Sequence, residues 1–142
     1  MKKQNNYDYS KFERILNAAI EVIGQKGYHE AKIKDISDVA GVAEGTIYNY
    51  FTNKKDLLVS IFKVKLEDYT KLANSELEKT DNPIEKLKIL INYHFRFMCE
   101  NPSLAHVFQV QLRKNDPDIR EKLKKDLKNY FTIIDNVILE GV

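Results

Sequence analysis

Apolar residues recur every three or four positions along most of the 142-residue chain, which is the spacing of one face of an α-helix. The first stripe opens after Ser10, a residue suited to capping a helix, and ends at Gly27. Its members are Phe12, Ile15, Leu16, Ala19, Val22 and Ile23. No strand-like alternation persists along the sequence. The pattern predicts an all-α fold of about seven helices.

Prolines and one asparagine mark where the later helices begin. Pro83 and Pro102 each follow an asparagine, and Pro117 follows an aspartate. Proline suits the first turn of a helix, because the N–H that it lacks would have no partner there. Asn53 opens a longer helix whose apolar pattern continues to about Leu77. These stripes predict helices over residues 53–77, 84–100, 102–112 and 118–138.

The long helix that starts at Asn53 divides the chain into two parts. A chain of 142 residues fits one domain, or a small domain followed by an incomplete second one. A helix of this length is able to join two domains. We expect a three-helix head over residues 1–52 and a helical body over residues 53–142.

Composition narrows the class of protein. With 43% apolar and 31% charged residues, the chain has the balance of a globular protein rather than a disordered one. Cys99 is the single cysteine and there are three histidines, so neither a disulfide scaffold nor a zinc site is predicted. The first residues lack the apolar core of a signal peptide, and no run of about 18 apolar residues occurs. These features predict a cytoplasmic protein.

The net charge of +2 is small, but it is unevenly distributed. Residues 1–65 hold 11 Lys or Arg against 8 Asp or Glu, whereas residues 66–142 hold 12 against 13. The positive excess therefore lies in the half that contains the head, which favours contact with phosphate groups. The asymmetry is a weak signal, because a difference of this size is common by chance.

Residues 31–51 have the pattern of two short helices joined by a sharp turn. Apolar residues of the first helix share one face: Ile33, Ile36, Val39 and Ala40. Gly41 supplies the positive φ that the turn requires. Ile47 and Phe51 form the inner stripe of the second helix. This is the layout of a helix-turn-helix, whose second helix enters the major groove of DNA.

The segment DISDVAGVAEGTIYNYFTNKKDLL, residues 35–58, resembles the DNA-binding segment of TetR-family transcriptional regulators. The positions that carry the resemblance are Ile36, Ala40, Gly41, Val42, Gly45, Thr46, Tyr48, Phe51, Lys54 and Leu57. Ala31 and Ala43 depart from the family pattern, which has Ser or Thr there as helix caps. Loss of such a cap costs about 0.5–2 kcal/mol. The resemblance implies a DNA-binding head, with its helix starts weakened at these two alanines.

The resemblance also assigns roles to individual residues of the head. Glu44 and Gly45 are expected to approach base edges, and Asn49 lies on the same outer arc. Thr46, Tyr48 and Lys54 are expected at the DNA backbone, and Lys34 at a base or a phosphate. Tyr50 is a further candidate for DNA contact. The hypothesis requires Thr46 and Tyr48 to face outward.

Three of these roles have alternatives. Glu44 either accepts a hydrogen bond from a cytosine amino group or points into solvent, away from phosphate. Tyr50 contacts DNA or wedges between helices, and Lys54 binds phosphate or is a solvated lysine. A phosphate contact at Lys54 predicts that Lys54→Ala lowers the salt dependence of binding by about one unit.

The segment from His94 to Gly141 is similar to the ligand domain of TetR-family repressors of fatty-acid degradation. The marks are Gln111-Leu112-Arg113, residues 120–122 and the ending Leu-Glu-Gly. In that subgroup a long-chain acyl-CoA is the effector and its binding releases the operator. Members continue with two further helices that pair across a dimer. The resemblance therefore implies an incomplete body, either because the sequence is a fragment or because the dimer is built differently.

Large side chains of the body are candidates for lining an effector tunnel. The apolar candidates are Phe62, Tyr69, Phe95, Met98, Phe108, Leu112, Tyr130 and Ile134. Taken singly, each is equally consistent with an ordinary core residue. Arg96 or Arg113 would meet phosphates of a CoA group or be surface cations. We expect His94 and His106 to be buried, as hydrogen-bonded core residues or as ligand contacts.

The sequence contains no catalytic constellation and implies no cofactor. The leading hypothesis is a homodimeric repressor that binds a palindromic operator on double-stranded DNA and releases it when a hydrophobic small molecule, such as a long-chain acyl-CoA, occupies the body. One alternative is a repressor of an efflux pump that senses a lipophilic drug. Another is a helical protein-binding module that does not touch DNA.

Overall fold

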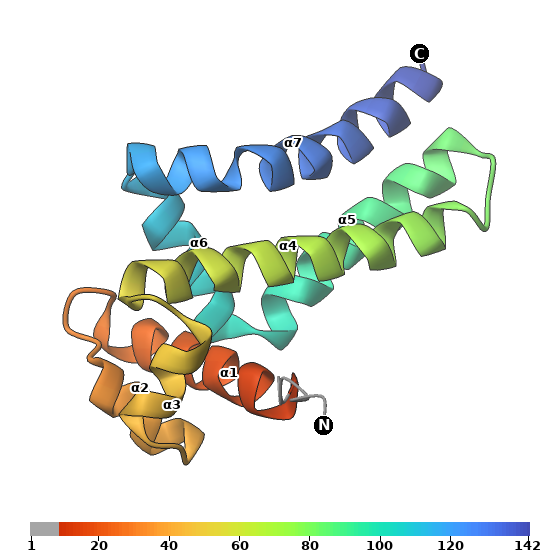
Figure 1. Cartoon of the computed structure of the whole chain (residues 1–142). Coiled ribbons are helices and arrows are strands. Elements are labelled where there is room, and N and C mark those ends of the chain that lie inside the picture. Colours follow the sequence, from red (N-terminus) through yellow and green to blue (C-terminus); the bar gives the residue numbers. More distant parts are fainter. Residues whose placement is uncertain (1–8) are drawn as a thin grey trace, which may run out of the picture. The chain divides into compact units, whose positions relative to one another are not determined.

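The computed structural model describes residues 9–142, and all regular structure in this range is α-helical (Figure 1). The helices are α1 (Tyr9–Lys26), α2 (Ile33–Ala40), α3 (Glu44–Tyr50), α4 (Lys54–Leu77), α5 (Pro83–Glu100), α6 (Pro102–Arg113) and α7 (Pro117–Glu140). The predicted all-α class is confirmed. Residues 1–8, the first residues of the expected head, lie outside the described part of the chain.

The chain divides by packing into two units, one ending at Ser60 and the other beginning at Ile61. The boundary between these packing units lies inside α4, eight residues after the division that we expect from the sequence at residue 52. The first two turns of α4 belong to the first unit and carry Leu57 and Leu58, both with no exposed surface. A helix start is visible in the sequence, whereas the point at which one helix changes packing partners is not. We call residues 9–60 the head and residues 61–142 the body.

In the head, α1 supplies most of the core. Its buried residues are Ile15, Leu16, Ala18, Ala19, Ile20, Val22 and Ile23. Phe12 stacks on Phe51 with ring centroids 5.4 Å apart, which joins the start of α1 to the end of α3. Ile36 and Ile47 are fully buried, whereas Val39, expected on the inner face of α2, is 51% exposed. The inner face of α2 is therefore narrower than its apolar pattern indicates.

Side-chain caps start three of the later helices where the sequence indicates. The Asn82 and Asp116 side chains each accept two backbone N–H groups at the starts of α5 and α7, ahead of their prolines. Asn53 Oδ1 accepts the Asp56 N–H at 2.8 Å, and Asp56 in turn accepts the Thr52 N–H at 2.8 Å. Asn101 differs, because its amide donates back to Phe97 O at 3.3 Å and leaves α6 without a side-chain cap.

In the body, α4, α5 and α7 share one core. Tyr69, Ala73 and Leu77 of α4 pack against Leu90 of α5 and Val137 of α7. An ion pair between Lys86 Nζ and Glu140 Oε2, 2.8 Å apart, joins the start of α5 to the end of α7. The helix α6 joins α5 to α7 at the opposite end (Figure 1). The side chains that line the space between these four helices are described below.

Candidate functional site

The outer face of α3 is open to solvent. Glu44, Gly45 and Asn49 are exposed, and Tyr48 is 52% exposed. Thr46 is half-buried, while Ile47 between them is fully buried. Glu44, Gly45, Tyr48 and Asn49 are therefore accessible from outside the head, and Thr46 is partly accessible.

Tyr50 has a different environment from the rest of this face. Its ring is half-buried, 6.1 Å from the ring of Phe12 and 6.4 Å from that of Phe51. Aromatic pairs at this spacing stabilise packing between helices. The geometry favours the alternative in which Tyr50 wedges α3 against α1.

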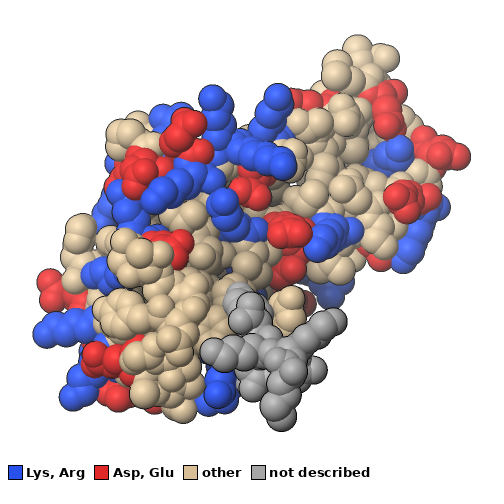
Figure 2. Space-filling view, in the orientation of Figure 1, with Lys and Arg blue, Asp and Glu red and all other residues tan. Residues whose placement is uncertain are grey.

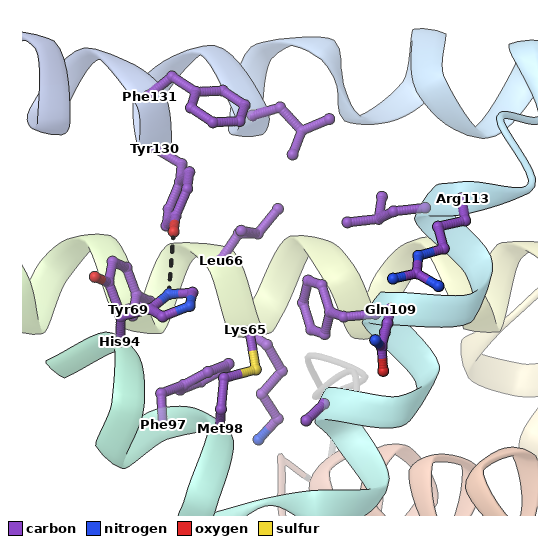
Figure 3. A pocket seen from close by; sticks show the side chains of 14 residues that line it. Lys65, Leu66, Tyr69, His94, Phe97, Met98, Gln109, Arg113, Tyr130 and Phe131 are labelled. Carbon is purple, nitrogen blue, oxygen red and sulfur yellow. Dashed lines mark hydrogen bonds between the residues drawn. The ribbon is translucent and has the colours of Figure 1, made fainter. Parts of the chain in front are cut away.

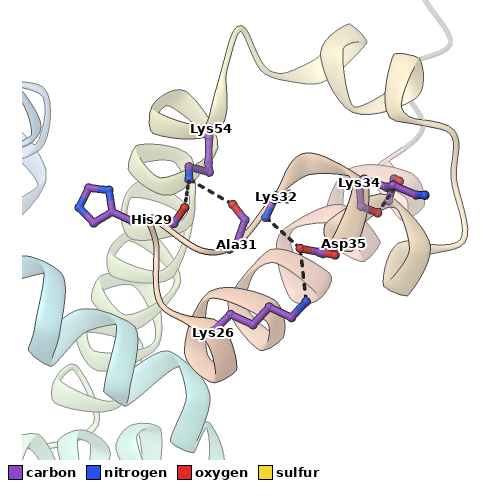
Figure 4. A network of polar contacts seen from close by, with 8 residues as sticks. Lys26, His29, Ala31, Lys32, Lys34, Asp35 and Lys54 are labelled. Carbon is purple, nitrogen blue, oxygen red and sulfur yellow. Dashed lines mark hydrogen bonds and ion pairs between the residues drawn. The ribbon is translucent and has the colours of Figure 1, made fainter.

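The two departures from the family pattern have different outcomes. Ala43 is the N-cap of α3, in extended conformation (φ −72°, ψ 152°), and it provides no side-chain hydrogen bond. Ala31 is not a cap, because α2 is capped at Lys32 and Ala31 is 99% buried one residue earlier. Asp35 supports this helix start by accepting the Lys32 N–H at 3.1 Å. That hydrogen bond lowers the pKa of Asp35, and the ion pair with Lys26 at 3.4 Å lowers it further (Figure 4).

Lys54 faces into the head, where the sequence analysis expected a phosphate contact or a solvated cation. Its ammonium donates to three backbone carbonyls, Tyr28 O at 2.6 Å, Ala31 O at 3.1 Å and His29 O at 3.3 Å. It also lies 4.5 Å from the centre of the Tyr28 ring. An ammonium has three donors, so these carbonyls use all of them. Figure 4 shows the lysine bridging the start of α4 and the loop before α2.

Lys34 is an exposed cation on α2. It lies on the outer side of α2, and its carbonyl accepts the Ser37 hydroxyl at 2.8 Å. No ion pair involves the Lys34 side chain among the described residues. Its charge is available to a phosphate group.

The turn between α2 and α3 is held by Gly41 and Arg14. Gly41 is in the left-handed region (φ 70°, ψ 36°) and its N–H bonds to Ser37 O. Arg14 Nη2 donates to Ala40 O at 2.7 Å and to Gly41 O at 3.4 Å. A Cβ at Gly41 would come within 3.3 Å of the same nitrogen. The turn therefore needs glycine for its backbone conformation, and an added Cβ would displace the end of the Arg14 side chain slightly.

Two glycine substitutions in the helix-turn-helix should change the stability of the protein in opposite directions. Gly41→Ala should lower the free energy of unfolding by about 1–2 kcal/mol, because alanine is strained in the left-handed region. Gly45→Ala should raise it by about 0.5–1 kcal/mol, because Gly45 is helical and a Cβ there meets no atom within 4 Å. Urea unfolding followed by circular dichroism measures both. Equal effects at the two positions would contradict this account of the turn.

The body contains a cavity of about 570 Å³ between α4, α5, α6 and α7 (Figure 3). Its wall is mostly apolar and aromatic, which suits a hydrophobic ligand. The lining residues are Lys65, Leu66, Tyr69, His94, Phe97, Met98, Ala105, Phe108, Gln109, Leu112, Arg113, Leu127, Tyr130 and Phe131.

The structure brings together six of the nine residues expected to bind the effector. They are Tyr69, Met98, Phe108, Leu112, Arg113 and Tyr130. Phe62 lies behind the wall, with no exposed surface and its ring 4.6 Å from that of Phe108. Ile134 packs on the core cluster, and Phe95 is 63% exposed. These three do not line the cavity.

Several polar residues of the body lie in other places than the sequence predicts. Arg113 lines it, whereas Arg96 pairs with Glu100 at 3.5 Å on the surface of α5. His94 and His106 are both exposed and not core residues. His94 Nδ1 lies 3.4 Å from the Tyr130 hydroxyl, at the cavity wall (Figure 3). Figure 3 places this pair and Arg113 at opposite ends of the space.

The tyrosines of the wall remain neutral over a wide pH range. Burial, together with the neighbouring Tyr130, raises the pKa of Tyr69 to about 12, and the Tyr69 hydroxyl lies 3.5 Å from Leu90 O. Burial also raises the pKa of Tyr130. Both hydroxyl groups therefore stay uncharged at neutral pH.

Sequence reasoning missed several wall residues. They include Leu66, Phe97, Ala105, Gln109, Leu127 and Phe131. The signal was present as helical spacing, because Ala105, Phe108 and Leu112 are three and four residues apart on one face of α6. Selection by side-chain size passed over Ala105, although a small residue is what leaves room for a ligand.

Other kinds of site are not found in the described part of the chain. No group of three or more His, Cys, Asp or Glu residues there is placed to hold a metal ion. None of its helices is long and apolar enough to cross a membrane. Cys99, on α5, is exposed and is a free thiol.

A helix-turn-helix with an open recognition helix, followed by a helical body with an apolar cavity, defines a DNA-binding regulator with a ligand domain. Comparison with known families agrees. Residues 15–61 match the family described as bacterial regulatory proteins, tetR family, and residues 62–142 match the YsiA-like protein, C-terminal region. The chain belongs to the TetR family of transcriptional regulators, and it is not an enzyme.

Individual relatives extend the comparison. The chain is 38% identical to the fatty acid metabolism regulator protein of Bacillus subtilis over 132 residues, which is 93% of this chain and 68% of the relative. Its fold matches the fatty acid degradation regulator FadR of Bacillus halodurans with a TM-score of 0.85, covering 92% of this chain and 70% of the other. It matches FadR of B. subtilis in complex with stearoyl-CoA with a TM-score of 0.86 and the same coverage. Both structures are 38% identical in sequence to this chain.

A second relative covers less of the chain. The regulator YvdT of B. subtilis is 40% identical over 85 residues, 60% of this chain and 44% of that protein. The chain thus spans about two thirds of the length of one relative and less than half of the other.

Proposed function

We propose that the protein is a repressor that binds an operator as a dimer and releases it when a long-chain acyl-CoA occupies the body. The observation that carries the proposal is one chain with both an open recognition helix and an apolar cavity of about 570 Å³. The likeness to a FadR structure that contains stearoyl-CoA supports this class of effector. We place the protein in the cytoplasm, where a bacterial operator lies.

On DNA, we propose that Glu44, Gly45 and Asn49 approach base edges, since they are exposed on α3. The Thr46 and Tyr48 hydroxyls and the Lys34 ammonium contact the backbone and fix the register. Two heads would read a palindrome with half-sites about 34–36 Å apart, one turn of the duplex. Lys54 and Tyr50 support this surface from behind.

Release follows from the continuity of α4. This helix starts in the head and carries Lys65, Leu66 and Tyr69 on the cavity wall. A ligand that favours one position of these side chains biases the helix, and hence the separation of the two heads in a dimer. Its effect on the operator equals the difference between its affinities for the two states.

A gel-shift assay with genomic fragments at modest salt tests the proposal. We expect one or a few fragments to bind in preference to random DNA, and stearoyl-CoA to release them at micromolar concentration. Binding without any preference over random DNA would contradict an operator-binding repressor, and no DNA binding at all would favour a protein-binding module. Sequence-specific binding that no acyl-CoA reverses would contradict the proposed effector but not the proposed role as a repressor.

The cavity argues against a cationic drug as the effector. Its charged lining residues are Lys65 and Arg113, and no carboxylate lines it among the described residues. A lipophilic cation would meet like charge without a compensating acid. A thermal-shift comparison of stearoyl-CoA with tetraphenylphosphonium should show stabilisation by the former alone.

A further inference from the structure

A second hollow lies between α4 and α7, with a volume of about 520 Å³. It is lined by Lys63, Leu66, Glu67, Thr70, Lys71, Lys122, Lys125, Asp126 and Asn129. We call it the lysine groove, because four ammonium groups surround it against two carboxylates. Figure 2 shows Lys and Arg side chains gathered over the first half of α7 and the part of α4 beside it.

Two of the four lysines are already paired. Lys71 Nζ lies 3.0 Å from Glu67 Oε1, and Lys122 Nζ lies 3.4 Å from Asp118 Oδ2. Within the described residues, Lys63 and Lys125 form no ion pair. The groove therefore has one lysine without an ion-pair partner on each of its walls, and the one further carboxylate in its lining, Asp126, pairs with neither.

The lysine groove adjoins the apolar cavity. Leu66 lines both, so the two hollows lie on either side of one α4 side chain. On α7, Lys125 and Asn129 line the groove while Leu127 and Tyr130 line the cavity. The two helices thus present a basic stripe beside an apolar one, an arrangement that matches a ligand with a hydrocarbon tail and an anionic head.

We propose that the lysine groove binds the phosphate groups of the effector's head, with Lys63 and Lys125 as the principal contacts. The inference rests on the proposed function, and it assigns a place to the part of an acyl-CoA that the apolar cavity does not accommodate. Ammonium groups bind phosphate as point charges and need no fixed bidentate geometry. The charge of the groove adds affinity for the CoA ester over the free fatty acid.

The test compares two double variants of the full chain. Lys63→Gln with Lys125→Gln removes the two unpaired charges, while Lys124→Gln with Lys128→Gln removes two exposed charges of α7 that do not line the groove. Calorimetric titration measures binding of stearoyl-CoA, stearate and CoA. We expect the first variant to bind stearoyl-CoA about 5- to 30-fold more weakly, with stearate and operator binding unchanged. The second variant should match the wild type.

Other outcomes overturn the inference in distinguishable ways. An equal loss of stearoyl-CoA affinity in both double variants would show a general effect of net charge. No loss of affinity in either variant would show that the lysine groove does not bind the effector. Loss of operator affinity with stearoyl-CoA affinity intact would assign the groove to DNA phosphates. In each of these cases, stearoyl-CoA binding by the wild type keeps the proposed function, whereas its absence would overturn both.

Discussion

Replacing Lys54 with methionine should weaken binding to every operator sequence by about tenfold or more without changing its salt dependence. The Lys54 ammonium bonds to three carbonyls of the loop that leads into α2, and methionine has a similar unbranched side chain but none of its donors. Each part-buried carbonyl left unsatisfied costs about 1–3 kcal/mol. The free energy of unfolding should therefore fall together with DNA affinity, as urea denaturation and gel shift would measure.

Lys34→Met is the matched control, because Lys34 is exposed on the neighbouring helix. Loss of a phosphate contact there should lower the slope of log affinity against log salt by about one, with stability unchanged. The two lysines are thus separated by two independent measurements. A reduced slope of log affinity against log salt in Lys54→Met, with unchanged stability, would show that Lys54 contacts the DNA backbone. That result would contradict the hydrogen bonds of Lys54 to the three carbonyls.

Replacing Ala105 with tryptophan should give a repressor that binds its operator and is no longer released by acyl-CoA. Ala105 lines the cavity from α6. An indole placed there occupies the volume that a hydrocarbon chain requires, and overpacking of about 1–3 kcal/mol corresponds to roughly 5- to 150-fold weaker ligand binding. Gel shift with increasing stearoyl-CoA measures the release.

His106→Trp is the control for this substitution, since His106 is the next residue along α6, is exposed and does not line the cavity. It adds the same side chain to the same helix outside the cavity and should respond to stearoyl-CoA as the wild type does. Normal release in Ala105→Trp would show that the effector binds elsewhere. Loss of operator binding in both variants would point to a role of α6 in stability.

The starts of α5 and α7 could be predicted from the sequence, because neighbouring residues determine them. Asn82 and Asp116 cap the helices that Pro83 and Pro117 open, and Gly41 makes the turn that its positive φ allows. Such features depend on a few neighbouring residues, so one sequence contains them. The open face of α3 follows in the same way from the burial of Ile47.

The features that could not be predicted from the sequence depend on contacts between residues far apart in the chain. The bonds of Lys54 cross 23 to 26 positions, and no local pattern shows that these carbonyls converge on it. Phe95 was expected in a tunnel because it is large and apolar, yet it lies outside the space that the helices enclose. Whether an apolar residue faces a cavity, a core or solvent is decided by packing between helices, which periodicity alone does not contain.

The position of Cys99 has a practical consequence. The chain has one thiol, it is exposed, and its neighbour Met98 forms part of the cavity wall. A maleimide fluorophore would therefore attach at a single defined place, without prior removal of other cysteines. Labelled protein would offer an optical readout of occupancy in real time, from which association and dissociation rates of candidate inducers follow directly.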